Sequence, residues 1–332
     1  DWSGSYARTE SETPNSYYML FEDIEAYSHD PILDASIPLA AWVDSARTDI
    51  NRSRLRNGYL SRANQFEDNY TLLGNLEIPL TSGLVNSTFK AGLKFQSMAR
   101  ELENTGLAET FYYLGGLEMK TAIDLWESSN DKLAMTPDGR ISLTNFVAPD
   151  PFKIGTFLDG DFTMRNPLDV DRVKRWFGVQ EEILNPDRYE LEGNYQYNEE
   201  ITAAYAMVKL NVGSWFRLIS GVRIEDTYND MTAKYSRLQE RYGQEGTIQD
   251  TSRTKVYQEV MPHLHLRLVP TDWFDVRLSY AQTLARPDYN MVIPKGNINA
   301  ERARITAGNP DLQHMTAENY DITATLFSSR LG

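Results

Sequence analysis

Hydrophobic and polar residues alternate along much of this chain. In the stretch WFDVRLSYAQTLARPDY at residues 273–289, every second residue from Phe274 to Tyr280 is apolar, and the residues between them are polar or small. Successive side chains of a β-strand point to opposite faces, so this pattern predicts a strand with one apolar and one polar face. The alternation stops at Arg286-Pro287, and a proline, which lacks a backbone N–H, fits the end of a strand ladder.

The same alternation recurs from one end of the chain to the other. It appears at residues 1–9, 70–80, 88–100, 200–212, 215–227, 256–268 and 317–328. Each stretch has about the length that a tilted strand needs to cross a bilayer, roughly 9–11 residues. The pattern therefore predicts about eight antiparallel strands.

The connections between these stretches alternate between short and long. Short turns at 81–87, 213–214 and 270–272 are separated by long connections, which run over 10–58, 102–188, 229–254 and 287–316. Outer-membrane barrels combine short periplasmic turns with long extracellular loops. Trp215 and Trp273 directly follow short turns, where an aromatic girdle is expected. We predict an all-β fold, an antiparallel transmembrane β-barrel segment with its short turns at one end and its long loops at the other.

In such a barrel the apolar face contacts lipid and the polar face lines the lumen. The residues predicted to face lipid are Phe89, Leu93, Leu218, Val222, Leu264, Leu266, Val276 and Leu278. The residues predicted to face the lumen are Lys94, Arg217, Arg223, His265, Arg267 and Arg277. Alternation also builds soluble sandwiches, in which the same leucines and valines would meet a second sheet.

Composition narrows the function. The 332 residues carry a net charge of −14, which argues against nucleic acid as a partner. The chain has no cysteine, so a disulfide framework, a thiolate metal site and a cysteine nucleophile are excluded. Its 19 tyrosines and 6 tryptophans suit surfaces that are half apolar and half wet. No apolar run is long enough for a transmembrane helix.

Residues that carry chemistry are sparse. His263 and His265 share the polar face of one strand, but no third metal ligand is evident, so a solvated lumen pair is the simpler interpretation. The sequence Asp159-Gly160-Asp161 resembles the start of a calcium loop but lacks the later glutamate, which favours a turn. No nucleophile elbow, phosphate loop or catalytic carboxylate pair is present, so we predict neither an enzyme nor a cofactor.

The connection at 102–188 is the best place to look for specificity, because long loops are usually functional. Its candidate solute-binding aromatics are Tyr112, Tyr113, Trp126, Phe157 and Trp176. The alternative is that they form the loop's own small core. Within this loop, residues 169–184 read DVDRVKRWFGVQEEIL, which predicts an amphipathic helix capped by Asp169.

Residues 277–294, RLSYAQTLARPDYNMVIP, resemble a signature in the barrels of TonB-dependent outer-membrane transporters. In that family, a strand ending in laRP is followed by a loop, a GNP-x-L turn and a strand beginning A-x-NYD. The segment GVRIEDT at 221–227 is similar to the family's GvR-x-E-x-T, and residues 85–101 resemble an earlier family strand. The motif residues, for which we expect structural roles, are Arg223, Glu225, Arg286, Pro287, Gly308, Asn309, Pro310, Asn319 and Tyr320.

The resemblance implies a protein of the cell outer membrane that takes up a scarce solute, of siderophore, carbohydrate, vitamin or peptide class. It implies as partners the bilayer and lipopolysaccharide, the TonB complex acting through a plug domain, and in some members a surface lipoprotein. We find no match to the plug or to a closing strand, and therefore expect residues 1–332 to be a central part of a larger barrel, in which the N-terminal and C-terminal strands do not pair. The alternative function is a soluble or surface β-protein that binds a partner through its long loops.

Overall fold

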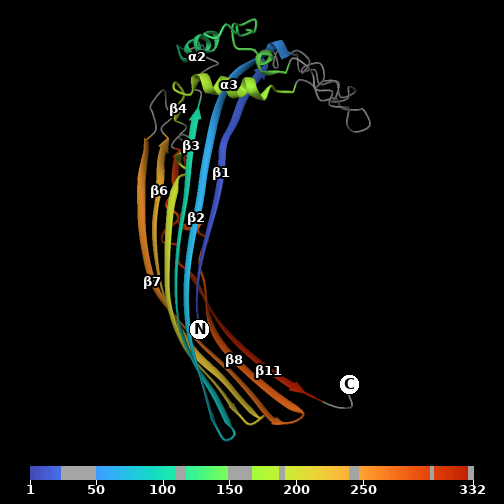
Figure 1. Ribbon diagram of the computed structural model, residues 1–332, viewed down its shortest axis with the longest axis vertical. Coiled ribbons are helices and arrows are strands. Elements are labelled where there is room, and N and C mark those ends of the chain that lie inside the picture. Colours follow the sequence, from blue (N-terminus) through green and yellow to red (C-terminus); the bar gives the residue numbers. More distant parts are fainter. Residues whose placement is uncertain are drawn as a thin grey trace, which may run out of the picture. The chain divides into compact units, whose positions relative to one another are not determined.

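The computed structural model describes residues 1–23, 50–108, 117–148, 167–186, 191–238, 247–299 and 303–327. Eight long strands lie side by side in the order in which they occur along the chain (Figure 1). They are β1 (Trp2–Asp23), β2 (Ser53–Ser82), β3 (Val85–Ala108), β5 (Tyr195–Val212), β6 (Phe216–Leu238), β7 (Thr247–Thr271), β8 (Phe274–Ala285) and β11 (Met315–Leu326). The predicted number of strands and their antiparallel pairing from β3 to β11 are confirmed.

Shorter elements lie in the connections. Strand β4 (Asn185–Pro186) pairs with β3, and β9 (Gly296–Asn299) pairs with both β10 (Arg304–Ala307) and β6. The helical elements are η1 (Ile50–Arg52), α2 (Leu117–Glu127), η3 (Leu143–Phe146), α3 (Val170–Gln180) and α5 (Tyr289–Val292). None of the described helices is long and apolar enough to cross a membrane.

The short turns lie at one end of the sheet, as predicted. The register pairs Val85 with Val212, and Phe216 with Leu268, so that neighbouring hairpins end at the same level. Backbone hydrogen bonds join the turns themselves, from the Gly213 N–H to the Leu84 carbonyl at 2.9 Å and from Val269 to Trp215 at 2.7 Å. Gly213 has a φ of +52°, a conformation that suits glycine and allows the tight turn.

Several strands extend further than predicted. Strand β1 continues to Asp23 and β2 begins at Ser53, so that much of the expected loop over 10–58 is strand. Likewise β6 reaches Leu238 and β7 begins at Thr247, inside the expected loop over 229–254. The prediction was wrong here because it followed apolar alternation, whereas the backbone ladder continues after the side chains have become polar.

The two predicted sets of side chains lie on opposite faces of the sheet. Directly opposed residues of an antiparallel pair project to the same side. Arg217 opposes Arg267, which in turn opposes Arg277, and we call the face that carries them the inward face. The next level joins Leu218, Leu266 and Leu278 on the other face, which we call the outward face. Phe89, Leu93 and Lys94 follow the same rule through their partners on β5.

The outward face carries an apolar band. On β6 the band covers nine residues from Phe216 to Ile224, close to the 9–11 residues that a membrane-crossing strand needs. Trp215 lies at the turn end of the band and is 53% exposed, and Tyr228 lies beyond the other end. All strands among the described residues belong to one sheet, so no second sheet covers these leucines and valines. This arrangement excludes the soluble sandwich and fits a wall whose apolar side faces lipid.

The first and last long strands stand at the two ends of the strand order. Strand β11 pairs with β8, and within the described residues β1 and β11 are not hydrogen-bonded neighbours. The prediction that the two end strands do not pair is therefore confirmed.

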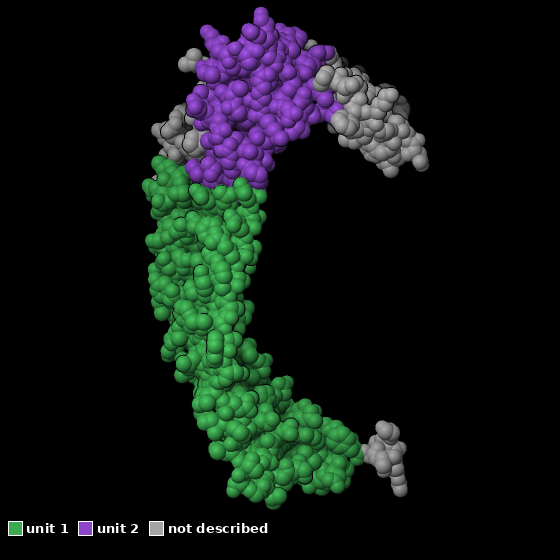
Figure 2. Space-filling model, viewed as in Figure 1, with its two compact units in different colours: residues 1–12, 64–103, 192–332 green, residues 13–63, 104–191 purple. Residues whose placement is uncertain are grey.

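The chain divides into two compact units (Figure 2). Unit 1 comprises residues 1–12, 64–103 and 192–332, and unit 2 comprises 13–63 and 104–191. The connection at 102–188 therefore does not form a compact unit by itself, because nearly all of it belongs to the same unit as residues 13–63. Each unit has its own cluster of buried side chains, centred on Tyr195 and Tyr197 in unit 1 and on Trp126 and Trp176 in unit 2.

The facing of β6 predicts a position-dependent cost of charge. Val222→Arg places a cation in the middle of the apolar band and should destabilise the folded protein in lipid vesicles by about 2–4 kcal/mol. Thr232→Arg, on the same face of the same strand but beyond the band, should change the unfolding free energy by less than about 0.5 kcal/mol. Denaturant unfolding in vesicles measures both. Equal costs at the two positions would contradict a lipid-facing band.

Candidate functional site

The segment from Arg286 to His314, which joins β8 to β11, packs against the inward face of unit 1. Strand β8 ends at Ala285, and Arg286 and Pro287 follow it. Asp288 then caps the short helix α5 by accepting a hydrogen bond from the Asn290 N–H at 2.8 Å. We call residues 286–314 the inward segment. Its described residues contact β5, β6 and β7, so it covers part of the polar wall beyond the apolar band.

A network of charges fixes the start of the inward segment. Arg286 donates to Glu225 Oε2 at 2.6 Å and to Thr227 Oγ1 at 3.0 Å, both on β6. Arg223 donates to the other carboxylate oxygen of Glu225 at 2.5 Å. The Glu225 side chain is largely buried, and its single carboxylate pairs with both guanidinium groups. Arg223 and Glu225 face inward and pair with each other along β6.

Aromatic rings fill the space beside this network. The ring of Tyr289 on α5 lies 6.1 Å from Tyr195 and 6.0 Å from Tyr197, and the guanidinium of Arg100 stands over it at 3.7 Å. The ammonium group of Lys295 lies 5.4 Å from the centre of the Tyr195 ring. Burial, reinforced by the nearby charge of Glu199, raises the pKa of Tyr197, so its hydroxyl stays protonated and donates to that carboxylate at 3.1 Å. These contacts hold α5 against β3 and β5.

The far end of the inward segment is fixed to β7. Lys255 Nζ donates to the Leu312 carbonyl at 2.5 Å, and the His314 ring contacts Glu259 Oε1 at 2.5 Å. The same ring stacks on Tyr257 with 4.4 Å between centroids. The inward segment is therefore attached to the wall at both ends.

The GNP motif folds the inward segment back on itself. A Cβ atom at Gly308 would lie 1.9 Å from the Ile293 carbonyl oxygen, so only glycine fits this close approach. The Asn309 N–H donates to the Met291 carbonyl at 2.7 Å, and the Asn309 side chain accepts from the Asp311 N–H at 3.0 Å. Pro310 lies within this turn. The motif thus shapes a turn, as expected from its residue types.

The last two motif residues lie on β11. Asn319 faces inward and its side chain lies 3.4 Å from the Ala281 carbonyl oxygen. Tyr320 faces outward, is 70% exposed and packs beside Tyr280 at 4.8 Å between ring centres. Tyr320 therefore belongs to the lipid side of the wall and not to the polar network.

Of the five predicted loop aromatics, the structure describes two, Trp126 and Trp176. Trp126 and Trp176 are fully buried in the core of unit 2, 5.9 Å apart, and Phe146 packs against both. Both rings are core residues, but this core is not the loop's own, as the alternative interpretation had it, because it also contains Leu55 and Leu60 of β2. Tyr112, Tyr113 and Phe157, like Asp159-Gly160-Asp161, lie outside the described residues.

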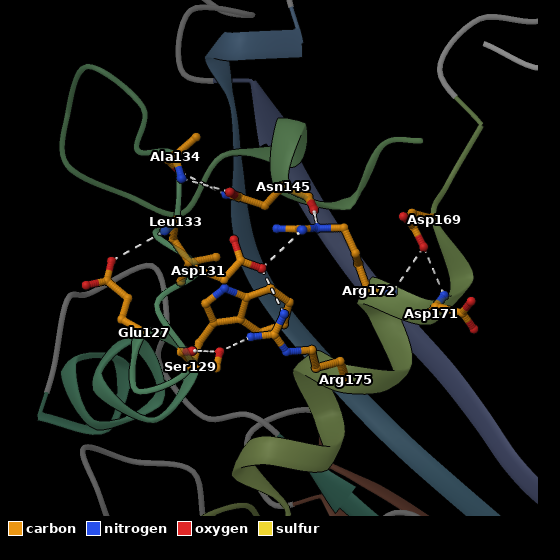
Figure 3. Close-up of polar contacts among 11 residues, drawn as sticks. Glu127, Ser129, Asp131, Leu133, Ala134, Asn145, Asp169, Asp171, Arg172 and Arg175 are labelled. Carbon is orange, nitrogen blue, oxygen red and sulfur yellow. Dashed lines mark hydrogen bonds and ion pairs between the residues drawn. The ribbon is translucent and has the colours of Figure 1, made fainter. Parts of the chain in front are cut away.

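Figure 3 shows how polar contacts tie α3 to the loop after α2. Asp131 accepts hydrogen bonds from Arg172 at 3.2 Å and from Arg175 at 2.8 Å, and Arg175 lies over the Trp126 ring at 4.0 Å. Asp169 caps the helix by accepting from the Asp171 and Arg172 N–H groups, which confirms the predicted helix and its cap. The charges of α3 therefore support packing of unit 2.

His263 and His265 lie next to each other on the inward face. The rings of His263 and His265 lie 6.0 Å apart on the inward face. Among the described residues, no group of three or more histidine, aspartate or glutamate side chains is placed to hold a metal ion.

A comparison with known protein families identifies the family of this chain. The model of the family described as TonB dependent receptor-like, beta-barrel matches residues 6–332. The chain belongs to this family. It is accordingly a β-barrel protein of the outer membrane.

Three solved receptors of the outer membrane are similar at low identity. The ferric-catecholate import receptor Fiu from Escherichia coli K12, in its closed form, is 12% identical with a TM-score of 0.41, and the match covers 84% of this chain and 31% of that one. The siderophore receptor PiuA from Acinetobacter baumannii is 12% identical, with a TM-score of 0.33 and coverages of 82% and 30%. The ferric citrate transporter FecA, unliganded, is 11% identical, with a TM-score of 0.30 and coverages of 70% and 22%.

The chain thus spans less than a third of the length of each of these three proteins, and TM-scores below 0.5 support no conclusion about its solute. No curated protein matches the chain.

Sequence analysis missed several residues of this TonB-dependent receptor-like wall. Tyr195, Tyr197 and Tyr289 carry no motif, and their only signal was the high tyrosine content of the chain. Lys255 and His314 also carry no motif, and their contacts with Leu312 and Glu259 form only through the folding of the inward segment.

The buried network predicts a specific loss of stability. Glu225→Gln leaves Arg223 and Arg286 without their shared counter-charge and should lower the unfolding free energy by about 3 kcal/mol. It should also release the inward segment, so that trypsin cleaves at Lys295 or Arg304 faster than in the wild type. Lys234→Gln is the control, because its ion pair with the exposed Asp250 should contribute less than about 1 kcal/mol. Unchanged cleavage in Glu225→Gln would show that this network does not hold the inward segment.

The helix cap of α3 predicts a smaller and local effect. Asp169→Ala removes the acceptor for two backbone N–H groups and should destabilise α3 by about 1 kcal/mol. Asp171→Ala, in the first turn but not at the cap, should cost only a few tenths of a kcal/mol. Hydrogen exchange of the α3 amides measures both variants, and equal exchange rates in the two would argue against the cap.

Proposed function

We propose that this protein takes up a scarce solute through the outer membrane, and that the inward segment gates its path. The observation that carries the proposal is the position of that segment. It lies on the polar side of a wall whose other side carries the apolar band, and buried polar contacts hold it there. A segment that only closed a rim would have no need of a charge network on the inward side.

The nature of these contacts suits a gate. Ion pairs and hydrogen bonds such as Arg286–Glu225 and Lys255–Leu312 can exchange for contacts with water or a solute, unlike a closely packed apolar core. A passing solute with polar groups therefore has a physical means of releasing the segment. The solute itself belongs to the siderophore, carbohydrate, vitamin or peptide classes.

The proposed partners follow from family membership. Energy would reach the barrel from the TonB complex through a plug domain, and the bilayer and lipopolysaccharide would surround the outward face. A surface lipoprotein is a further candidate partner. The two unpaired edge strands, β1 and β11, would pair with further strands of one larger barrel, because hydrocarbon does not tolerate an open edge. The long 102–188 connection would lie on the extracellular side.

The absence of cysteine allows a direct test of the gate. Ser236 on β6 and Asn297 on β9 are partners in a parallel ladder. Neighbouring strands lie about 4.8 Å apart, within the Cα separation of roughly 4.4–6.8 Å that a disulfide spans. Oxidised Ser236→Cys/Asn297→Cys protein should lock the inward segment to the wall. Uptake is first measured in wild type with labelled siderophores, oligosaccharides, cobalamin and peptides, and then in the locked protein with the solute that enters.

We expect uptake to stop in the oxidised protein and to return after reduction. The control disulfide is Gln196→Cys/Thr232→Cys, which joins β5 to β6 where the strands are already paired, and it should leave uptake unchanged. The two single variants show the effect of each substitution alone. Full uptake by the locked protein would refute the gate, and a wild type that takes up none of the solutes in a TonB-dependent way would refute the proposed function.

A further inference from the structure

The apolar band of the outward face is shorter on β8 and β11 than on the three strands before them. On β5, β6 and β7 the band covers nine residues each, at 204–212, 216–224 and 260–268. On β8 and β11 the outward residues are apolar or aromatic only over 274–280 and 320–326, seven residues in each case. Seven residues are fewer than the roughly 9–11 that a membrane-crossing strand needs.

On these two strands the band stops at Gln282 and Glu318, which we call the polar break. The two residues are direct partners in the ladder between β8 and β11. Continuing the register of β7 and β8 by one residue puts Gln282 level with Pro262, which opposes Val222 in the band of β6. An amide and a carboxylate therefore face outward at a level where the neighbouring strands are still apolar.

Two tyrosines border the polar break on the side of the short turns. Tyr280 and Tyr320 oppose each other on the outward face, and the Tyr320 hydroxyl donates to Glu318 Oε2 at 2.9 Å. Tyrosine is enriched where membrane lipid meets water, because its ring is apolar and its hydroxyl is polar. On β6 the outward tyrosine is Tyr228, beyond the band, whereas Tyr280 lies level with Ser220, the one polar outward residue within the band of that strand.

Acyl chains are an unfavourable surrounding for the polar break. An ionised carboxylate in hydrocarbon loses its hydration, and this loss is costly unless other polar groups replace the water. The printed hydrogen bond of the Glu318 carboxylate comes from a neutral hydroxyl, that of Tyr320, which compensates only part of the loss. Water or polar lipid headgroups at the level of Glu318 would remove this cost.

We propose that the headgroup layer of the outer leaflet contacts Gln282 and Glu318, and that the bilayer is thinner beside β8 and β11 than beside β6. The polar break lies toward the long-loop end of the wall, which is the extracellular end in outer-membrane barrels. Strand tilt shifts both ends of a band and leaves its length unchanged, so tilt alone does not explain a shorter band.

The size of the effect follows from strand geometry. Two residues fewer correspond to about 7 Å along a strand and, at a tilt of about 45°, to roughly 5 Å of membrane thickness. A bilayer adapts to a short apolar stretch by thinning locally, at a modest cost. This lipid contact is independent of the proposed uptake, because it concerns the outward face and no solute.

Spin labels on single cysteines in phosphatidylcholine vesicles test the proposal. The labels replace Gln282 and Glu318 in one pair of variants and Val222 and Ala206, which oppose each other in the band of β5 and β6, in the control pair. The chain has no cysteine of its own, and heat-modifiable migration on gels confirms that each variant is folded. The ratio of accessibility to a water-soluble nickel complex over accessibility to oxygen should be several times higher at 282 and 318 than at 222 and 206.

Labels at the even positions of β8 from Phe274 to Leu284, and of β6 from Phe216 to Asp226, measure the thickness. The oxygen-rich stretch should end at Tyr280 on β8 and at Ile224 on β6, two residues shorter on β8. Stretches of equal length would overturn the thinning. High oxygen and low nickel accessibility at 282 and 318 would show that acyl chains cover the polar break. Low accessibility to both reagents would show that another protein or a second copy covers it, and either result would overturn the headgroup contact.

Discussion

Hydrocarbon offers no partner to a backbone N–H or carbonyl group, and this constraint governs the whole wall. The backbone N–H and carbonyl groups of each strand pair with those of the neighbouring strands. Between β6 and β7 this ladder runs from Phe216 opposite Leu268 to Arg237 opposite Thr247. The ladder fixes a side-chain period of two, which separates the outward apolar band from the inward polar face. Because the same ladder continues past Ile224, the strands provide a polar scaffold beyond the bilayer on which the inward segment rests.

Buried charge is the second organising element, and it occurs at two levels of the inward face. Beyond the apolar band, Glu225 pairs with Arg223 and Arg286 and thereby attaches the inward segment to β6. Near the short turns, the buried carboxylate of Asp275 pairs with Arg267 and Arg277. The first network joins the inward segment to β6, although the Nε of Arg286 is buried without a hydrogen-bond partner among the described residues. The second joins β7 to β8.

The strands, the turns and the facing of side chains could be predicted because one short-range rule, alternation, generates all of them. Leu218, Leu266 and Leu278 were assigned to one face from sequence alone, and the register confirmed it. The extensions of β1, β2, β6 and β7 were missed because their outward residues, such as Asp230 and Lys234, no longer carry the apolar signal. The contacts of Tyr289 and His314 depend on how 29 residues fold back over the wall, which no local pattern encodes. Trp126 and Trp176 show the same limit, because an aromatic residue in a loop has the same appearance in a sequence whether it binds a solute or packs a core.

The central claim is that one face of this sheet meets lipid and the other meets water. Spin labels on single cysteines introduced along β6, from Phe216 to Thr232, test it most directly in a reconstituted bilayer. We predict that oxygen accessibility is high at even positions up to Ile224 and that a water-soluble nickel complex reaches the odd positions up to Arg223. Even positions from Asp226 onward should also become accessible to nickel, whereas the odd positions from Glu225 to Met231, which are buried, should be protected. Absence of the two-residue period, or protection of the even positions from both reagents, would contradict the account.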